Sequence, residues 1–197
     1  MADATRDRIL EAALESLQRN GFAGSSTRAI GAIGGFNPAL IHYYFGSLHG
    51  LLLAALEHAS ERRLERHRGM LEAASSLADL VDALDVIYRE DRETGFVRVA
   101  SEMVAGGVAH PELGPRVVEL MEPWIALAEE GARRALAGSP FEALATPREL
   151  ATAAVTFYLG TNLMTQLVPD EAGIEELLAT ARRLVPLIDA AKAAADP

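Results

Sequence analysis

The 197-residue chain contains no cysteine, which excludes disulfide bonds and metal sites built on thiolates. Its first residues, MADATRDRILEAAL, alternate charged with apolar side chains and lack the continuous apolar segment of a signal peptide. No stretch approaches the roughly 20 apolar residues of a membrane span. These absences predict a cytoplasmic protein. Half of the residues are hydrophobic, enough for one or two small globular units with a real core.

Positive charge is scarce, and the net charge is −10. The imbalance is uneven along the chain. Residues 1–68 carry eight Arg and seven Asp or Glu, a net of +1, whereas residues 69–197 carry ten Arg or Lys and twenty-one Asp or Glu, a net of −11. An acidic second part repels nucleic acid, so any such partner is expected to contact the first part. A net of +1 there predicts modest non-specific affinity.

The chain shows neither the alternation of a β-strand nor an internal repeat, and its apolar residues recur at helical spacing. An all-α fold of about nine helices is therefore predicted. Gly21 is expected to end the first helix and Gly106-Gly107 to end a later one. Pro123 is expected to kink one long helix over residues 116–137. Thr146-Pro147-Arg148-Glu149 reads as a helix start, with a cap, a proline at the first position and a glutamate three residues later.

The stretch that organises the first part is TRAIGAIGGFNPALIHYYFGSLHGL, residues 27–51. Two short helices are predicted over residues 28–33 and 38–44, joined by Gly34-Gly35-Phe36-Asn37. Glycine permits a positive φ in the turn, Asn37 can cap the second helix, and Pro38 sets its first position. This pattern is typical of a helix-turn-helix motif, whose second helix enters the DNA major groove. Its predicted core residues are Ile30, Ile33, Phe36, Ile41 and Phe45.

These residues closely resemble the TetR family of transcriptional regulators. The residues that match the family pattern are Thr27, Ile30, Gly35, Asn37, Phe45, Ser47 and Leu51. Two positions depart from it: Leu48 stands where a lysine is usual, and Gly31 where an alanine is usual. The first removes a common phosphate contact, and the second lowers helix propensity by about 1 kcal/mol. The resemblance implies a DNA-binding domain over residues 1–50, including the start of a connecting helix, and a helical ligand-binding and dimerisation domain over residues 51–197.

The resemblance also indicates which side chains face DNA. Residues at the N-terminal end of a recognition helix reach base edges, and polar side chains beside them suit phosphate oxygens. Arg28 carries the guanidinium that pairs with guanine, and Leu40 can contact a thymine methyl group. The alternative to a DNA contact is that Tyr43 or Tyr44 is partly buried, and that His42 is a surface residue without a role in binding. The predicted DNA-binding residues are Thr27, Arg28, Asn37, Pro38, Ala39, Leu40, His42, Tyr43 and Tyr44.

For the second domain the resemblance rests on helix order and length, and it implies a ligand pocket among the middle helices. Apolar walls with a few polar groups are typical of a small-molecule site. The same residues can alternatively be plain core. The predicted ligand-binding residues are Tyr88, Phe96, Val99, Met103, Met121, Trp124, Phe157, Tyr158 and Asn162.

The resemblance further implies a homodimer built from the last two helices. Small residues allow helices to approach closely, and a two-fold four-helix interface would follow. Packing within the monomer is the alternative. The predicted interface residues are Ala153, Gly160, Thr161, Met164, Leu177, Ala181, Leu184 and Ile188.

The function predicted from these observations is a ligand-responsive repressor. It would bind a palindromic operator in double-stranded DNA as a homodimer and be released by a small, largely apolar effector. An enzyme is not expected, because no nucleophile triad, phosphate loop or HExxH motif is present. The five histidines, at positions 42, 49, 58, 67 and 110, show no metal-type pairing on one helical face, so neither a metal nor a cofactor is predicted. The alternative is a helical protein–protein adaptor that no longer binds DNA strongly.

Overall fold

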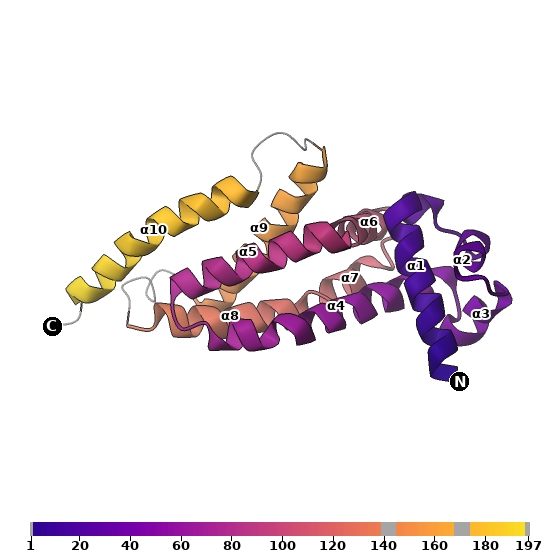
Figure 1. Ribbon diagram of the computed structural model, residues 1–197, viewed down its shortest axis with the longest axis horizontal. Coiled ribbons are helices and arrows are strands. Elements are labelled where there is room, and N and C mark those ends of the chain that lie inside the picture. The colour runs from indigo at the N-terminus through magenta and orange to yellow at the C-terminus, as the bar shows by residue number, and fades with distance from the viewer. Residues whose placement is uncertain (1, 139–144, 168–173, 196–197) are drawn as a thin grey trace. The chain divides into compact units, whose positions relative to one another are not determined.

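The computed structural model describes residues 2–138, 145–167 and 174–195, and these residues form ten α-helices and no strand (Figure 1). The predicted all-α class is confirmed. By packing, the chain divides into two compact units, residues 1–63 with 95–120, and residues 64–94 with 121–197. The first unit therefore takes in two helices that follow residue 51. The predicted boundary at residue 51, between a DNA-binding domain and a ligand-binding and dimerisation domain, stays a prediction.

The first unit contains α1 (Ala2–Gly24), α2 (Thr27–Gly34), α3 (Ala39–Phe45), the part of α4 (Leu48–Ala73) up to Arg63, α6 (Phe96–Ala109) and α7 (Gly114–Glu119). Helix α1 packs against both α2 and α6. Ile9, Ala13 and Leu17 of its apolar stripe are fully buried, as their helical spacing predicts, whereas Leu14 is half-buried. The core residues contributed by α1, α2, α3 and α4 include Ile9, Leu10, Ala13, Leu17, Ile30, Ile41, Leu51 and Leu52.

Phe22 joins α1 to α6. Helix α1 spans Ala2–Gly24, but its helical backbone is interrupted at Gly21, the predicted helix end, where φ is 71° and ψ is −179°. The Phe22 amide donates a 2.8 Å hydrogen bond to Glu102 Oε2. The Phe22 ring lies so close to Gly106 that a Cβ there would be 2.4 Å from the ring. The predicted helix end at Gly106-Gly107 is therefore wrong: α6 continues to Ala109, and Gly106 serves close packing instead.

The second unit contains the end of α4, α5 (Leu77–Thr94), α8 (Glu122–Leu136), α9 (Pro147–Leu167) and α10 (Ile174–Ala195). The prediction of one long helix over residues 116–137 is wrong, because α7 ends at Glu119 and α8 begins at Glu122. Pro123 lies in the first turn of α8, where its missing N–H costs nothing. This split raises the number of helices in the described residues from about nine to ten.

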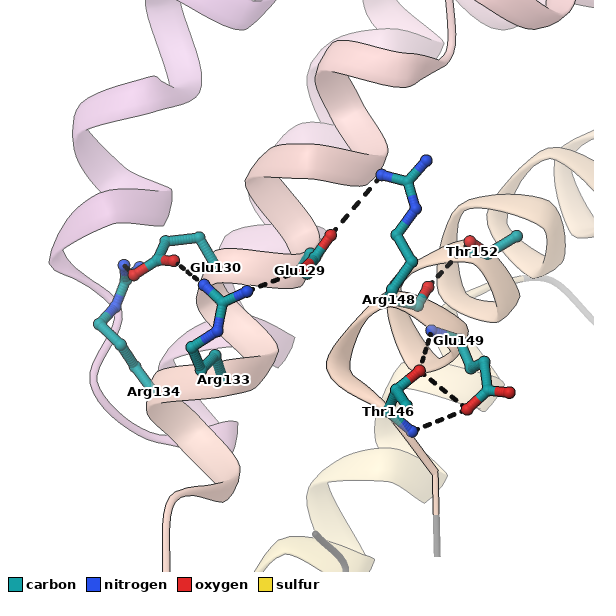
Figure 2. A network of polar contacts seen from close by, with 8 residues as sticks. All are labelled: Glu129, Glu130, Arg133, Arg134, Thr146, Arg148, Glu149 and Thr152. Atoms are coloured by element: carbon teal, nitrogen blue, oxygen red, sulfur yellow. Dashed lines mark hydrogen bonds and ion pairs between the residues drawn. The ribbon is translucent and has the colours of Figure 1, made fainter.

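The start of α9 has the predicted capping box (Figure 2). Thr146 N donates to Glu149 Oε2 at 2.8 Å, and Glu149 N donates back to Thr146 Oγ1 at 3.2 Å. Thr146 Oγ1 also donates to Glu149 Oε2 at 2.8 Å. The two bonds that the carboxylate accepts, first from the Thr146 backbone and then from its side chain, lower the pKa of the Glu149 carboxyl. The neighbouring Arg148 reaches α8, with its guanidinium 2.6 Å from Glu122 and 3.6 Å from Glu129. The cap and these ion pairs fix α9 beside α8.

A second charged contact joins α10 to α5. The Arg182 guanidinium donates to Asp82 Oδ1 at 2.9 and 3.0 Å and to Asp85 Oδ2 at 2.9 Å. Arg89 pairs with Asp85 from within α5. The hydrogen bond from Arg182, followed by that from Arg89, lowers the pKa of the Asp85 carboxyl. The contact lies beside an apolar cluster of Val81, Tyr88, Leu178 and Val185.

Replacing Asp85 with asparagine is expected to lower the free energy of unfolding by about 1–3 kcal/mol, the usual contribution of hydrogen bonds to a charged group. Because the pKa of Asp85 is lowered in the folded chain, this stabilisation is complete above its ordinary value of 3.8 and is lost as the pH falls through the lowered value. Urea unfolding at neutral pH and near pH 3 measures both effects. Asp82→Asn, at an exposed side chain, is the matched control with a smaller loss. An equal loss for Asp85→Asn at both pH values contradicts the prediction.

No single helix in the described part of the chain is long and apolar enough to cross a membrane. One bent pair, Ala39–Phe45 with Leu48–Ala73, passes such a test by length and composition only, and its helices meet at 65°.

Candidate nucleic-acid interface and effector site

Helices α2 and α3 form the predicted helix-turn-helix. Ser26 caps α2 by accepting a 3.1 Å hydrogen bond from Ala29 N. Gly35 has φ 63° in the turn, which is the conformation that glycine permits. Asn37 Oδ1 accepts from Ala39 N at 2.9 Å and so caps the start of α3 as predicted. Phe36, between these two residues, is buried. The turn thus follows from local sequence signals.

Gly31 is explained by packing rather than by helix propensity. A Cβ at this position would lie 2.8 Å from Pro38 Cγ and 3.0 Å from the Phe36 carbonyl oxygen. Both distances are shorter than ordinary van der Waals contacts. The absence of the usual alanine therefore lets α2 approach the start of α3 more closely. Glycine at this position lowers the helix propensity of α2, but it allows a tighter turn between α2 and α3.

The predicted DNA-binding residues differ in exposure. Tyr43 is 81 % exposed, whereas Tyr44 is half-buried, and their rings meet edge to face at 5.0 Å. His42 is exposed, and its Nδ1 lies 3.2 Å from the Gly46 carbonyl oxygen at the end of α3. The other exposed members are Arg28, Asn37 and Ala39, and the other half-buried ones are Thr27, Pro38 and Leu40. Ile30, Phe36 and Ile41 are buried as predicted, while Ile33 and Phe45 are half-buried.

The predicted ligand-binding residues fall in both units. In the first, Val99 and Met103 are fully buried, and the Arg63 guanidinium lies 4.1 Å from the centre of the Phe96 ring. In the second, Tyr158 packs against two apolar clusters. One contains Tyr88, and the other has Trp124 packed against it. The structure therefore brings Tyr88, Trp124 and Tyr158 into one neighbourhood of the second unit.

Polar groups accompany these aromatic side chains. Asn162 is buried, and its Nδ2 donates a 2.7 Å hydrogen bond to the Tyr158 carbonyl oxygen. The Tyr158 hydroxyl donates to Asp91 Oδ2, and Asp91 is fully buried. Met121 is half-buried, whereas Phe157 is 57 % exposed. Asp91 was missed by the sequence reasoning, because one acidic residue in a charged segment of α5 gives no sign of burial.

Five of the eight predicted interface residues belong to an exposed, largely apolar stripe along α9 and α10. On α9 the spacing is alternately four and three residues, which keeps the stripe on one side of the helix. Thr161 is the exception, because it is buried and its hydroxyl donates to the Phe157 carbonyl oxygen. Ala181 and Ile188 on α10 are half-buried. The exposed members of the stripe, including three residues beyond the prediction, are Ala153, Phe157, Gly160, Met164, Leu167, Leu177, Leu184 and Leu187.

Residues 9–55 match the family model of bacterial regulatory proteins of the tetR family. A solved structure, that of the multidrug binding protein EbrR complexed with imidazole, is 26% identical with a TM-score of 0.65, and the match covers 92% of this chain and 94% of that chain. The predicted resemblance to the TetR family is therefore confirmed over residues 9–55. The family match places the helix-turn-helix described above, from α2 to α3, inside the family's defining segment.

The curated relatives that match this chain are named as regulators. The HTH-type transcriptional regulator UidR of Escherichia coli is 30% identical over 112 residues, which are 57% of this chain and 56% of UidR. The HTH-type transcriptional repressor NicS of Pseudomonas putida is 42% identical over 57 residues, 29% of this chain and 27% of NicS. The chain thus matches between about a quarter and just over half of the length of these relatives.

Two arginines that lie near the helix-turn-helix were missed by the sequence reasoning. The Arg6 guanidinium lies 5.5 Å from the centre of the Phe45 ring, and that of Arg8 lies 5.9 Å from the centre of the Phe36 ring. Both side chains come from the start of α1 and are exposed. They bring positive charge to the two ends of α3 and its turn. Only the fold could reveal this, because Arg6 is 39 residues from Phe45 and Arg8 is 28 residues from Phe36 in the sequence.

Proposed function

We propose that this chain is a DNA-binding transcriptional repressor whose α3 reads an operator in the major groove. The observation that carries the proposal is the exposed face of the capped α3, with Arg28 beside it on α2 and Arg6 and Arg8 supplying further charge. Exposed aromatic and polar tips suit base edges and phosphate oxygens, and guanidinium groups suit guanine and phosphate. The repressor assignment draws on the name of NicS.

The proposed repressor acts as a homodimer on a palindromic operator. The exposed stripe on α9 and α10 supports this, because large apolar side chains exposed along two adjacent helices are typical of a protein interface. A two-fold dimer would hold its two α3 helices about 34–36 Å apart, the spacing of successive major grooves. Only the paired arrangement gives each half of the operator its own recognition helix.

The proposed effector is small and largely apolar, with one polar group. The aromatic neighbourhood of Tyr88, Trp124 and Tyr158 would supply apolar contacts, and Asp91 and Asn162 would supply hydrogen-bond partners. An effector that binds better to a dimer with the wrong helix spacing shifts the population away from DNA. Operator affinity would then fall when the effector is added, which is the basis of the repressor's release.

Fluorescence anisotropy with a labelled duplex from the DNA beside the chain's own gene tests DNA binding. We expect binding at least about 10³-fold tighter than to an unrelated duplex of equal length. The logarithm of the binding constant should fall linearly with the logarithm of salt concentration between about 50 and 200 mM. Equal affinity for both duplexes at every salt concentration, extended to duplexes tiling the neighbouring promoters, would contradict the proposal.

One observation favours a second function, a protein–protein adaptor. Leu48 at the start of α4 occupies the position of the usual phosphate-binding lysine, and the N-terminal 68 residues carry a net charge of only +1. An adaptor would show neither a preferred duplex nor a steep salt dependence. The same salt series therefore separates the two functions.

A further inference from the structure

Two histidines and a glutamate from distant parts of the sequence meet in the first unit. His49 is the second residue of α4, His110 follows the last residue of α6, and Glu112 lies in the turn before α7. One ring nitrogen of each histidine and one carboxylate oxygen of Glu112 all lie within 4.8 Å of one another. Glu112 Oε1 is 3.6 Å from His110 Nδ1 and 3.9 Å from His49 Nδ1. Three elements thus point their donor atoms at one small volume.

The surrounding residues hold the two imidazoles in place. The Phe22 ring lies 5.7 Å from the His49 ring and 5.6 Å from the His110 ring, measured between centroids. His110 N also donates a 2.8 Å hydrogen bond to the Gly106 carbonyl oxygen at the end of α6. Phe22 therefore forms an apolar wall on one side of the group. The Glu112 side chain is 63% exposed, which leaves room for water on another side.

The donor set and its spacing fit a transition metal ion. Imidazole nitrogens and carboxylate oxygens bind Zn²⁺ at about 2.0–2.2 Å, so ligand atoms around a tetrahedral ion are about 3.3 Å apart. The two nitrogen–oxygen distances of 3.6 and 3.9 Å need only small side-chain rotations to close. Ca²⁺ and Mg²⁺ prefer oxygen ligands, which makes a site with two imidazoles unsuitable for them.

We propose that His49, His110 and Glu112 bind one divalent first-row transition ion, with Zn²⁺ as the reference ion and water completing its coordination. An ion at this place would tie the first turn of α4 to the turn that follows α6. Only Gly46 and Ser47 separate α4 from α3, so the bound ion would restrain the end of the helix proposed to read DNA. An effect of the ion on operator affinity rests on the proposed function, whereas the metal site itself does not.

The site is tested by metal titration of tag-free protein that has been stripped with a chelator and then freed of it. Zn²⁺ affinity is measured by competition with a chromophoric chelator, and Co²⁺ binding by its visible absorption. We expect one ion per chain. His110→Gln and Glu112→Gln should each weaken binding at least about 100-fold, since even an indirect partner of a metal ligand contributes 10- to 100-fold. His58→Gln, which removes a histidine outside the group, should leave the affinity unchanged.

Three results would overturn the proposed site: no saturable binding, unchanged affinity in both variants, or an equal loss in His58→Gln. Circular dichroism and melting of the metal-free proteins check that each variant folds. Glu112→Gln keeps the test decisive if His110→Gln misfolds, because the Glu112 side chain is largely exposed. Operator binding with and without Zn²⁺ is measured separately, so a chain that binds metal without binding DNA refutes the proposed function and leaves the site standing.

Discussion

Gly160→Glu is expected to convert the proposed dimer into a monomer and to weaken operator binding by about 10²- to 10⁴-fold. Gly160 lies in the middle of the exposed stripe on α9, between Phe157 and Met164. Within the chain, a Cβ at this position meets no atom within 4 Å, so the substitution has space in the monomer. In a two-fold interface the new carboxylate would be buried without a partner, once from each subunit. Uncompensated burial of a charge costs about 3–5 kcal/mol, and lost bivalency accounts for the weaker DNA binding.

Gly69→Glu is the matched control for this prediction. Gly69 is also an exposed helical glycine, and a Cβ there likewise meets nothing within 4 Å. Both variants gain one negative charge and a similar increase in helix propensity. A difference between the two variants therefore does not come from net charge or helix propensity. Sedimentation velocity gives the oligomeric state, and anisotropy gives the operator affinity. A dimeric Gly160→Glu protein would place the interface elsewhere, and a monomeric wild-type protein would refute the dimer itself.

The features predicted correctly from the sequence are those fixed by neighbouring residues. The turn before α3 depends on Gly35 and Asn37, and the start of α9 depends on Thr146 and Glu149. Each of these signals acts within about four residues. Each capping side chain also identifies the backbone N–H group to which it hydrogen-bonds. No knowledge of the rest of the fold is needed to read them.

The features that the sequence reasoning missed depend on contacts between distant segments. Gly106 was expected to end a helix, but its role is to admit the Phe22 ring, which lies far away in the sequence. Pro123 was expected to kink a helix, but the chain begins a new helix there. The same limit hid the group of His49, His110 and Glu112, because a search for metal ligands on one helical face cannot find donors brought together by two helices and a turn.

Arg28→Ala is expected to weaken operator binding about 10- to 100-fold while leaving the fold unchanged. Arg28 is exposed near the start of α2, and α2 keeps its Ser26 cap and its buried Ile30 in the variant. One good bidentate contact to a base contributes about 1–3 kcal/mol of discrimination. Arg133→Ala is the matched control, since Arg133 is an exposed arginine of α8 that pairs with Glu129 and Glu130 in the second unit (Figure 2). The control removes the same charge and should bind the operator like the wild type.

The salt dependence of Arg28→Ala decides what the guanidinium contacts. If it contacts phosphate, affinity falls equally for operator and unrelated duplexes, and the salt slope decreases by about 1. If it contacts guanine, the operator loses affinity while the unrelated duplex does not, and the slope is kept. We expect the second pattern, because residues 1–68 carry a net charge of only +1 and phosphate contacts alone give no sequence specificity. If Arg28→Ala binds the operator with wild-type affinity, Arg28 makes no important contact. The base contacts would then come from the exposed residues of α3, and the phosphate contacts from Arg6 and Arg8.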